Sequence, residues 1–539
     1  MHSFDSDLFQ NRDPWEAKGF IVPSYDRDAL IRRTGADPLW LHFGAGNIFR
    51  AFIARIQDDL LEKGLADRGI IVAETYDPEI IDAVYTPFDN LFISADLSPD
   101  GDVRFRIPGS VTESVPVDAE RPGGLMRLRE IAARPSLSII SLTVTEKGYT
   151  LWAGDGSPLP DVARDMAAGP GSVQHLIGIL CTLLFERYEK GGRPIAVVSM
   201  DNMRHNGLIL RDSVTAIARS WVESGLTDPG FLDYLTDESR VSFPWSMIDK
   251  ITPRPSDEVF SLLTDFGIDG MAPVITGRGT YIAPFVNAEI PGYLVLEDSF
   301  PNGRPPLHAV GVYFGDRETV ERAERMKVCS CLNPLHTALA VFGCLLGFTR
   351  ISDEMKDPLL AGLVRRIGYS EGLPVVSDPG ILRPEEFLRE VIEERLPNPH
   401  IPDAPQRIAT DTSQKIPIRF GETILAYVRS DTRNASDLIF IPLTIAAWIR
   451  YLLGIDDSGL PMERSADPRL PRLTELLRDI EFPRPESVGN RLRPILSDPS
   501  LFIIDLYECG LGEKIENMFS EMLHGPGAVR AVLEKYLKS

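Results

Sequence analysis

The chain has 539 residues, of which 43% are hydrophobic and 25% are charged, and its formal net charge is −22. This length exceeds one ordinary hydrophobic core, so two or three domains are expected. The strong negative charge disfavours nucleic acid and anionic membrane as partners. The five cysteines are odd in number and scattered, which is typical of reduced thiols inside the cell. No paired Cys or His cluster indicates a metal site.

Nothing in the sequence predicts a membrane or export segment. The longest apolar runs, near 335–348 and 438–449, are too short to cross a bilayer. The N-terminal twenty residues are acidic and polar, which fits neither a signal nor a transit peptide. We therefore expect a cytoplasmic protein.

The first strong pattern follows a leader, 1–37, in which we expect a short helix at 26–34. An apolar strand at 39–43 runs directly into the glycine turn 44–50. A helical pattern at 51–63 and a second strand at 69–73 come next, and that strand ends at Glu74. This order is the opening unit of a dinucleotide-binding fold.

Particular residues of this unit suit a dinucleotide. Gly44 permits a tight turn, and Gly46 lets a pyrophosphate approach the backbone at the helix N-terminus. Glu74 is placed to accept a hydrogen bond from a ribose hydroxyl, and an acid there repels a 2′-phosphate, so NAD is favoured over NADP. Phe49 stands where the usual fingerprint has a third glycine, so the pattern is incomplete. The alternative is an ordinary strand–turn–helix with a glycine turn.

Three polar clusters follow. A β-branched strand at 137–145 leads into 146–149, and a strand at 194–199 leads into 200–207; the third cluster spans 243–255. Strands that alternate with helices predict a mostly parallel sheet, whose ligand crevice lies at the carboxyl ends of the strands. The first two clusters fall at such ends, which favours a functional role over ordinary turn chemistry.

The sequence pattern changes near residue 290, after which most predicted elements are helices. The predicted helices are 317–332, 334–346, 358–367, 384–395, 438–453 and 525–537. We therefore predict an α/β protein with two domains. Residues 1–289 form a Rossmann-like, doubly wound, mostly parallel sheet, and residues 290–539 form a mainly α-helical domain.

The helical half contains a second candidate site, at the junction of two helices. Lys327 lies in a run that turns apolar, and Asn333 and His336 follow it. A desolvated Lys can serve as a base, and Asn and His can donate hydrogen bonds to an oxygen that gains charge. The alternative is that Asn333 caps a helix, His336 is a satisfied core histidine, and Lys327 extends its amine into water.

Together these clusters resemble the polyol-specific long-chain dehydrogenase/reductase family, which includes mannitol dehydrogenases and fructuronate reductase. The resemblance covers nearly the whole chain from residue 39. Its landmarks are GAGNIFRAF (44–52), SLTVTEKGY (141–149), MDNMRHNG (200–207), SMIDKITPRP (246–255), EDSFPNGRPPL (297–307), MKVCSCLNPLHTALA (326–340) and RIATDTSQKIP (407–417).

The resemblance implies a zinc-independent hydride transfer with NAD. Lys327 would be the general base in alcohol oxidation and the acid in ketone reduction. The residues that would hold the reacting oxygen are Asn333, His336 and Asn202, and those that would contact the rest of the sugar are Asp249, Arg407 and Lys415. The residues expected to bind the cofactor are Gly44, Gly46, Asn47, Phe49, Arg50, Glu74 and Thr145.

Two departures from the family pattern stand out. The family usually places five steps between the Lys and the Asn, whereas this chain has six. Family members commonly carry Arg after the Asp, whereas this chain has Lys250. The first departure bears on the reach of Lys327, and a looser last helical turn before Pro334 would absorb the extra residue.

The leading hypothesis is an NAD-dependent oxidoreductase that interconverts a keto sugar acid and a sugar acid alcohol, D-fructuronate and D-mannonate. Arg407 and Lys415 can bind a carboxylate. The alternatives are mannitol 2-dehydrogenase, another polyol or tagaturonate dehydrogenase, and an NAD-binding sensor without activity. A sensor would be expected to lose Lys327 or Asn333, and both are present. A zinc polyol dehydrogenase is disfavoured because no ligand cluster is seen. We expect a monomer or weak oligomer.

Overall fold

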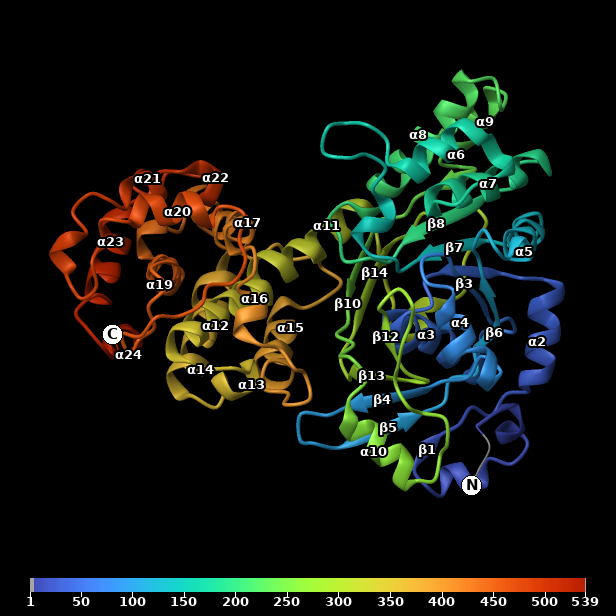
Figure 1. Ribbon diagram of the computed structural model, residues 1–539, viewed down its shortest axis with the longest axis horizontal. Helices are drawn as coiled ribbons and strands as arrows, with labels where there is room; N and C mark the ends of the chain where they lie inside the picture. Colours follow the sequence, from blue (N-terminus) through green and yellow to red (C-terminus); the bar gives the residue numbers. More distant parts are fainter. Residues whose placement is uncertain (1–3, 539) are drawn as a thin grey trace. The chain divides into compact units, whose positions relative to one another are not determined.

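The computed structural model describes residues 4–538, and its internal contacts divide the chain into two compact units, Met1–Glu321 and Arg322–Ser539. Figure 1 colours the first unit from blue to yellow-green and the second from yellow to red. From the sequence we predicted a domain boundary between residues 289 and 290. The structure keeps β14 (Tyr293–Glu297) and β15 (Tyr313–Gly315) in the first unit, because both join a sheet with β10 (Ser246–Asp249).

A six-stranded parallel sheet organises the first unit (Figure 1). Its strands in chain order are β2 (Trp40–Phe43), β3 (Ile70–Glu74), β6 (Val111–Pro116), β7 (Ile139–Leu142), β8 (Ile195–Ser199) and β9 (Val241–Ser242). The spatial order β6-β3-β2-β7-β8-β9 is the 3-2-1-4-5-6 order of a doubly wound dinucleotide fold. The order reverses between β2 and β7, and ligands of such sheets bind outside the carboxyl ends of those strands.

Two hydrophobic cores cover the two faces of this sheet. Successive side chains of a strand point to opposite faces. Leu41 and Phe43 accordingly pack with α5 (Pro122–Ala132), α7 (Leu176–Glu189) and α8 (Asn206–Glu223). Trp40 packs on the other side with α3 (Ala54–Glu62) and α4 (Glu79–Val84). The strands are therefore buried on both faces, as expected from their apolar sequences.

The described part of the N-terminal leader is built into the first unit. The helix expected near 26–34 is present as α2 (Arg27–Ala36). The short strand β1 (Phe20–Ile21) pairs with β5 (Val103–Arg106), in a sheet with β4 (Ile93–Leu97) and β13 (Phe285–Glu289). Trp15 and Phe20 lie in the core beneath that sheet, so their burial ties the segment down.

The second unit is helical, as the sequence predicted. Its most buried helices are α12 (Asn333–Leu346) and α19 (Phe440–Leu452). The same unit contains α14 (Pro358–Arg365), α15 (Pro384–Glu390), α18 (Glu422–Val428), α23 (Gly512–Glu521) and α24 (Ala528–Lys538).

Two helical stretches, Pro160–Glu189 and Arg317–Leu346, are long and apolar enough to cross a membrane, but 61% and 83% of their apolar windows are buried inside the protein.

Several helices contain a π turn, in which each N–H bonds to the carbonyl five residues earlier. Within residues 4–538 these turns are Phe49–Ile53, Met326–Cys331, Arg366–Gly372, Val391–Arg395 and Pro417–Gly421. A π turn takes up one extra residue in a helix and is frequent at functional sites. Two of the five lie on segments that the sequence analysis singled out, the glycine turn with its helix and the Lys327 run.

Candidate active site

The glycine turn after β2 has the shape that a dinucleotide requires. Gly44 has a φ of +103°, and a Cβ atom there would lie 2.2 Å from the carbonyl oxygen of Thr143, so only glycine fits. A Cβ atom at Gly46 would meet no heavy atom within 4 Å. The backbone at Gly46 therefore faces open space, and a pyrophosphate can approach it there.

Glu74 fastens this turn to the end of β3. Its carboxylate accepts hydrogen bonds from the backbone N–H groups of Ala45 (2.8 Å), Tyr76 (2.9 Å) and Asp77 (3.1 Å). The side chain is buried, and burial raises its pKa. Three backbone donors occupy most of the four or so lone-pair sites of a carboxylate. The ribose contact of Glu74 stays a prediction. The structure adds a second role, as the acceptor that holds the backbone of the glycine turn, which the sequence did not indicate.

Among the other residues predicted at this turn, the side chains of Phe49 and Arg50 are buried and support it from within. Phe49 stacks on the ring of His42, with 4.4 Å between the ring centroids. Arg50 donates to the carbonyl oxygen of Ala283 (2.7 Å) and to Oδ1 of Asn47 (2.8 Å). Asn47 itself is half-buried. Gly46 and Asn47 are thus the predicted residues at the accessible side of the turn.

A buried histidine joins β2 to β7, and the sequence analysis did not single it out. The ring nitrogens of His42 lie 2.6 Å from Oγ of Ser141 and 2.9 Å from Oγ1 of Thr143. Burial lowers the pKa of His42 to about 3, so the ring is neutral. The only sequence signal was a histidine inside an otherwise apolar strand.

The polar clusters predicted at the carboxyl ends of β7 and β8 lie at those ends. Thr145 and Asn202 are exposed there. Asn206, at the start of α8, is fully buried, and its side-chain amide donates to the carbonyl oxygens of Asp201 and Ser246, both at 3.0 Å. This links the end of β8 to β10, the strand that ends at the buried Asp249. Asn206 therefore positions the end of β8 against β10. It lies within the motif 200–207, but its role was not predicted from the sequence.

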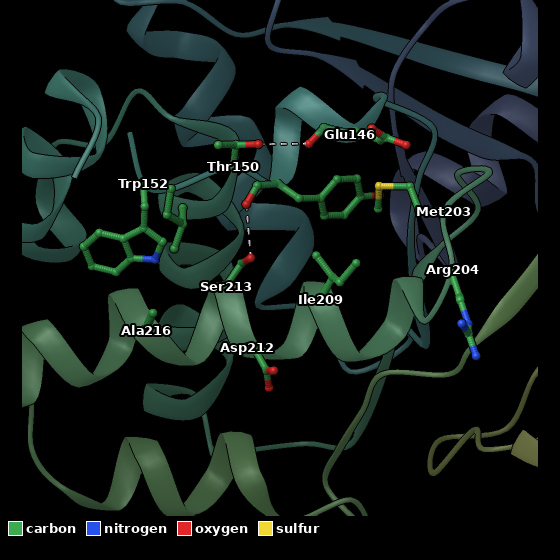
Figure 2. A pocket seen from close by; sticks show the side chains of 11 residues that line it. Glu146, Thr150, Trp152, Met203, Arg204, Ile209, Asp212, Ser213 and Ala216 are labelled. Atoms are coloured by element: carbon green, nitrogen blue, oxygen red, sulfur yellow. Dashed lines mark hydrogen bonds between the residues drawn. The ribbon is translucent and has the colours of Figure 1, made fainter. Parts of the chain in front are cut away.

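A pocket of about 480 Å³ opens beside these clusters (Figure 2). Its walls come from the segment 146–152, from the turn after β8 and from α8. They include Glu146, Tyr149, Trp152, Met203, Arg204, Ile209 and Asp212. The indole of Trp152 and the side chain of Ile209 are partly exposed, at 48% and 37%.

In the second unit, Lys327 lies on the π turn Met326–Cys331 and is 2% exposed. The N–H of Leu332 donates to the carbonyl oxygen of Lys327 (3.0 Å), a bond that spans five residues instead of four. This is the looser last turn expected from the extra residue before Asn333. The interpretation of Lys327 as a lysine that extends its amine into water is wrong, because the side chain is buried.

Asn333 does not cap the helix. α12 begins at Asn333 itself, and its cap residue, Leu332, makes no side-chain capping bond. The hydroxyl of Thr337 donates to the carbonyl oxygen of Asn333 (3.0 Å) and accepts from Nη1 of Arg419 (2.7 Å). The first turn of α12 is thus held by Arg419, and the capping alternative for Asn333 is wrong.

His336 lies among charged groups of the second unit. Its Nε2 atom is 3.8 Å from Oδ2 of Asp403. Burial lowers the pKa of His336 to about 4; Asp403 raises it, and the arginines Arg419, Arg395 and Arg407 lower it further. At neutral pH the ring is therefore uncharged and can offer one N–H donor and one acceptor.

The two predicted substrate cations lie in the same neighbourhood. Arg407 forms an ion pair with Asp403, the residue beside His336. The amine of Lys415 donates to the carbonyl oxygens of Ile408 (3.3 Å) and Thr410 (2.5 Å). Burial lowers the pKa of Lys415, and so do Arg419 and Arg407. Several cations thus surround a neutral imidazole, which suits an anionic ligand.

Comparisons with known proteins agree with this geometry. The mannitol dehydrogenase Rossmann-domain model matches residues 39–307, and the mannitol dehydrogenase C-terminal-domain model matches residues 319–518. The chain belongs to the mannitol dehydrogenase family. Members of this family are dehydrogenases, and the chain is an NAD-dependent oxidoreductase acting on CH–OH groups.

Two relatives and one solved structure illustrate the likeness. The chain is 52% identical over 531 residues to a D-mannonate oxidoreductase of Thermotoga maritima, with 98% of each chain covered. It is 32% identical to a mannitol 2-dehydrogenase of Neosartorya fischeri, over 90% of this chain and 89% of the other. The structure of Pseudomonas fluorescens mannitol 2-dehydrogenase with NAD and D-mannitol matches over the whole of both chains, with 25% identity and a TM-score of 0.70.

The described residues 4–538 of this family member contain no group of three or more His, Cys, Asp or Glu side chains that could hold a metal ion. The cysteines are free thiols, and four of them are buried, at positions 181, 329, 331 and 344. The zinc-independent mechanism stays a prediction, which activity after treatment with a chelator would test.

Proposed function

We propose that this enzyme interconverts D-fructuronate and D-mannonate with NADH and NAD. The observation that carries the proposal is the 52% identity, over 98% of both chains, to the Thermotoga maritima D-mannonate oxidoreductase. The cations around His336 support it, because a guanidinium and an ammonium group suit the carboxylate of a sugar acid. Arg407 and Lys415 are the proposed carboxylate and hydroxyl contacts.

The proposed catalytic roles follow from the chemistry of ketone reduction. Bound NADH supplies the hydride. Lys327 gives a proton to the substrate oxygen as that oxygen becomes an alkoxide. Asn333 and the neutral His336 donate hydrogen bonds to the same oxygen, and Arg419 keeps the turn that carries them rigid. Asn202 and Asp249 are proposed as further substrate contacts.

For the cofactor, the open backbone at Gly46 supports a pyrophosphate site on the turn 44–47, with Glu74 and Thr145 beside it. We propose a cytoplasmic enzyme that takes a small-molecule substrate and is a monomer or weak oligomer. The formal charge of −22 supports a soluble protein without nucleic acid or anionic membrane as a partner.

A polyol substrate is the second candidate, because relatives named mannitol 2-dehydrogenase match 90% of this chain. The test is turnover with NADH and NADPH against D-fructuronate, D-tagaturonate and D-fructose. We expect D-fructuronate with NADH to have the highest kcat/KM. D-fructose as the best substrate would redirect the proposal to mannitol, and equal use of the two cofactors would contradict the proposed role of Glu74.

The role of Lys327 is tested by Lys327→Met, which keeps an unbranched side chain and removes the amine. We expect kcat to fall by roughly 10²–10⁴-fold while NADH binding stays nearly intact. The matched control is Lys356→Met, which alters an exposed lysine paired with Asp353 in the same unit and should keep full turnover. Near-normal turnover of Lys327→Met would assign proton transfer to another group, with His336 and Lys147 the next candidates.

A further inference from the structure

Thr145 holds a backbone conformation that residues with a side chain rarely adopt. Its φ is +71° and its ψ is 161°. This region of backbone space is occupied almost only by glycine, and it persists in other residues only where the surroundings enforce it. Such positions cluster at ligand clamps and active sites. Thr145 is exposed at the carboxyl end of β7.

One side chain binds the backbone at this strained position. The carboxylate of Asp201, two residues after the end of β8, accepts hydrogen bonds from the N–H of Thr145 (2.9 Å) and from the N–H of Val144 (3.0 Å to both oxygens). The hydroxyl of Tyr149 donates to the other side of the same carboxylate (2.5 Å). Asp201 therefore binds the turn before and after its strained residue.

Tyr149 is itself held by hydrogen bonds at its hydroxyl and at its backbone carbonyl. Its hydroxyl lies 2.8 Å from Oγ of Ser199, the last residue of β8. Its carbonyl oxygen accepts a hydrogen bond from Oγ of Ser213 on α8 (3.1 Å). The turn 144–149 is thus fixed to the neighbouring strand and helix, with Asp201 as the central acceptor.

This turn lies beside the glycine turn. β2 and β7 are neighbours in the sheet, and the carbonyl oxygen of Thr143 lies 2.2 Å from the place where Gly44 would carry a Cβ atom. In a sheet of this order the dinucleotide lies outside the carboxyl ends of these two strands. The strained residue is therefore at the edge of the cofactor crevice.

We propose that Asp201 is a positioning residue for the cofactor: its carboxylate holds the backbone of Thr145 in the strained conformation, so that the turn 144–149 forms a rigid wall of the dinucleotide site. The inference rests on the proposed place of the cofactor on the turn 44–47. Without the carboxylate, Thr145 relaxes toward an ordinary conformation and the wall moves into or away from the crevice.

The test is the dissociation constant of NADH, measured by fluorescence titration of the intact protein without substrate. Asp201→Asn keeps the size of the side chain but has a single acceptor oxygen and no charge, so it cannot accept from Val144, Thr145 and Tyr149 together. We expect it to weaken NADH binding by about 10-fold or more. Adding Thr145→Gly should restore the affinity to within about threefold of Thr145→Gly alone, because glycine adopts this conformation without strain.

Thr145→Ala is the matched control in the Asp201→Asn background. Alanine removes the hydroxyl but keeps the Cβ atom that causes the strain, so it should not restore NADH binding. Wild-type affinity of Asp201→Asn, or equal recovery by Gly and Ala, would overturn the proposal, and so would no recovery by Gly. If Asp201→Asn alone does not fold, recovery of folding and of NADH binding by Gly and not by Ala supports the proposal.

A second carboxylate controls for general loss of stability. Asp165, on α6 (Pro160–Ala168), also accepts backbone N–H groups, those of Gln174 (2.9 Å) and His175 (2.8 Å). Asp165→Asn should lower Tm and leave the dissociation constant of NADH unchanged. An equal loss of NADH affinity in Asp165→Asn would overturn a specific role for Asp201.

Gly46→Val separates this inference from the proposed cofactor site. Its side chain would enter the open space at Gly46, where the cofactor is proposed to bind, so NADH binding should be lost while Tm is kept. If Gly46→Val bound NADH normally, the cofactor site would be elsewhere. Recovery of Tm in Asp201→Asn by Thr145→Gly would still report the contact between the two residues, so the two failures can be told apart.

Discussion

Glu354 is a buried acid beneath the helix that carries Asn333 and His336. It ends α13 (Ile351–Glu354) and is fully buried. Neither carboxyl oxygen has a hydrogen-bond partner among residues 4–538. A Cβ atom at Gly343 would lie 2.1 Å from Oε1, so the carboxyl packs directly on α12. Burial raises the pKa of Glu354 to about 9, and the group is protonated at neutral pH.

We expect Glu354→Gln to make stability less dependent on pH. The native protein keeps the proton on Glu354 up to about pH 9, whereas the unfolded chain loses it near the usual pKa of 4.5. Between these values the unfolded state binds fewer protons, so stability falls as pH rises. The whole effect is on the order of 6 kcal/mol at most. Glutamine does not titrate, so Glu354→Gln removes this pH dependence.

The measurement is Tm of the wild type and of Glu354→Gln from pH 5 to pH 9. The matched control is Glu386→Gln, which alters an exposed acid paired with Arg383 in the same unit. We expect the Glu386→Gln curve to follow the wild type and the Glu354→Gln curve to be flatter. Three parallel curves would contradict a neutral buried carboxyl at position 354.

The π turn Met326–Cys331 carries Lys327 and is held to a neighbouring helix by a side-chain hydrogen bond. In a π ladder the carbonyl of Cys329 would bond to the N–H of residue 334, which is proline and has none. The hydroxyl of Thr423, on α18, donates to this carbonyl (2.9 Å). Thr423 therefore ties the turn to α18.

Thr423→Val tests this contact, because valine keeps the shape of threonine and lacks the hydroxyl. A hydrogen bond of this kind contributes on the order of 0.5–1.5 kcal/mol to stability, so its loss should lower Tm. Because the turn carries Lys327, we also expect kcat to fall by about 10-fold with little change in KM. Thr423→Ser keeps the hydroxyl and should retain most of the activity. Unchanged kcat and Tm in Thr423→Val would contradict the role.

The enzyme as a whole is expected to work without a metal ion. A zinc-dependent dehydrogenase needs three protein ligands at its catalytic ion. Residues 4–538 hold no such group, and hydride transfer from NADH to a ketone needs only a proton donor and positioned hydrogen bonds. Activity should therefore survive prolonged dialysis against a chelator. A loss that zinc alone restores would contradict the zinc-independent mechanism.

Local patterns were enough to predict the elements of the candidate site. The strand–turn–helix–strand unit at 39–74 and the helix junction at 332–333 are encoded by neighbouring residues: apolar strands, two glycines, and a proline just after the start of a helix. Both are present in the structure. Side-chain partners were harder to predict. Glu74 was expected to face a ribose, and its carboxylate accepts three backbone N–H groups that only the folded turn brings to it.

Fold class, family and the segments that carry the site could therefore be predicted from the sequence, because periodicity, glycine turns and motif order are properties of short stretches. Which residues position those segments depends on how the chain folds. Asp201 and Thr145 are 56 residues apart, and Arg419 and Thr337 are 82 apart. Such pairs form only when strand order and helix packing bring distant residues together, and burial makes the hydrogen bond obligatory where the partner is buried, as Thr337 is.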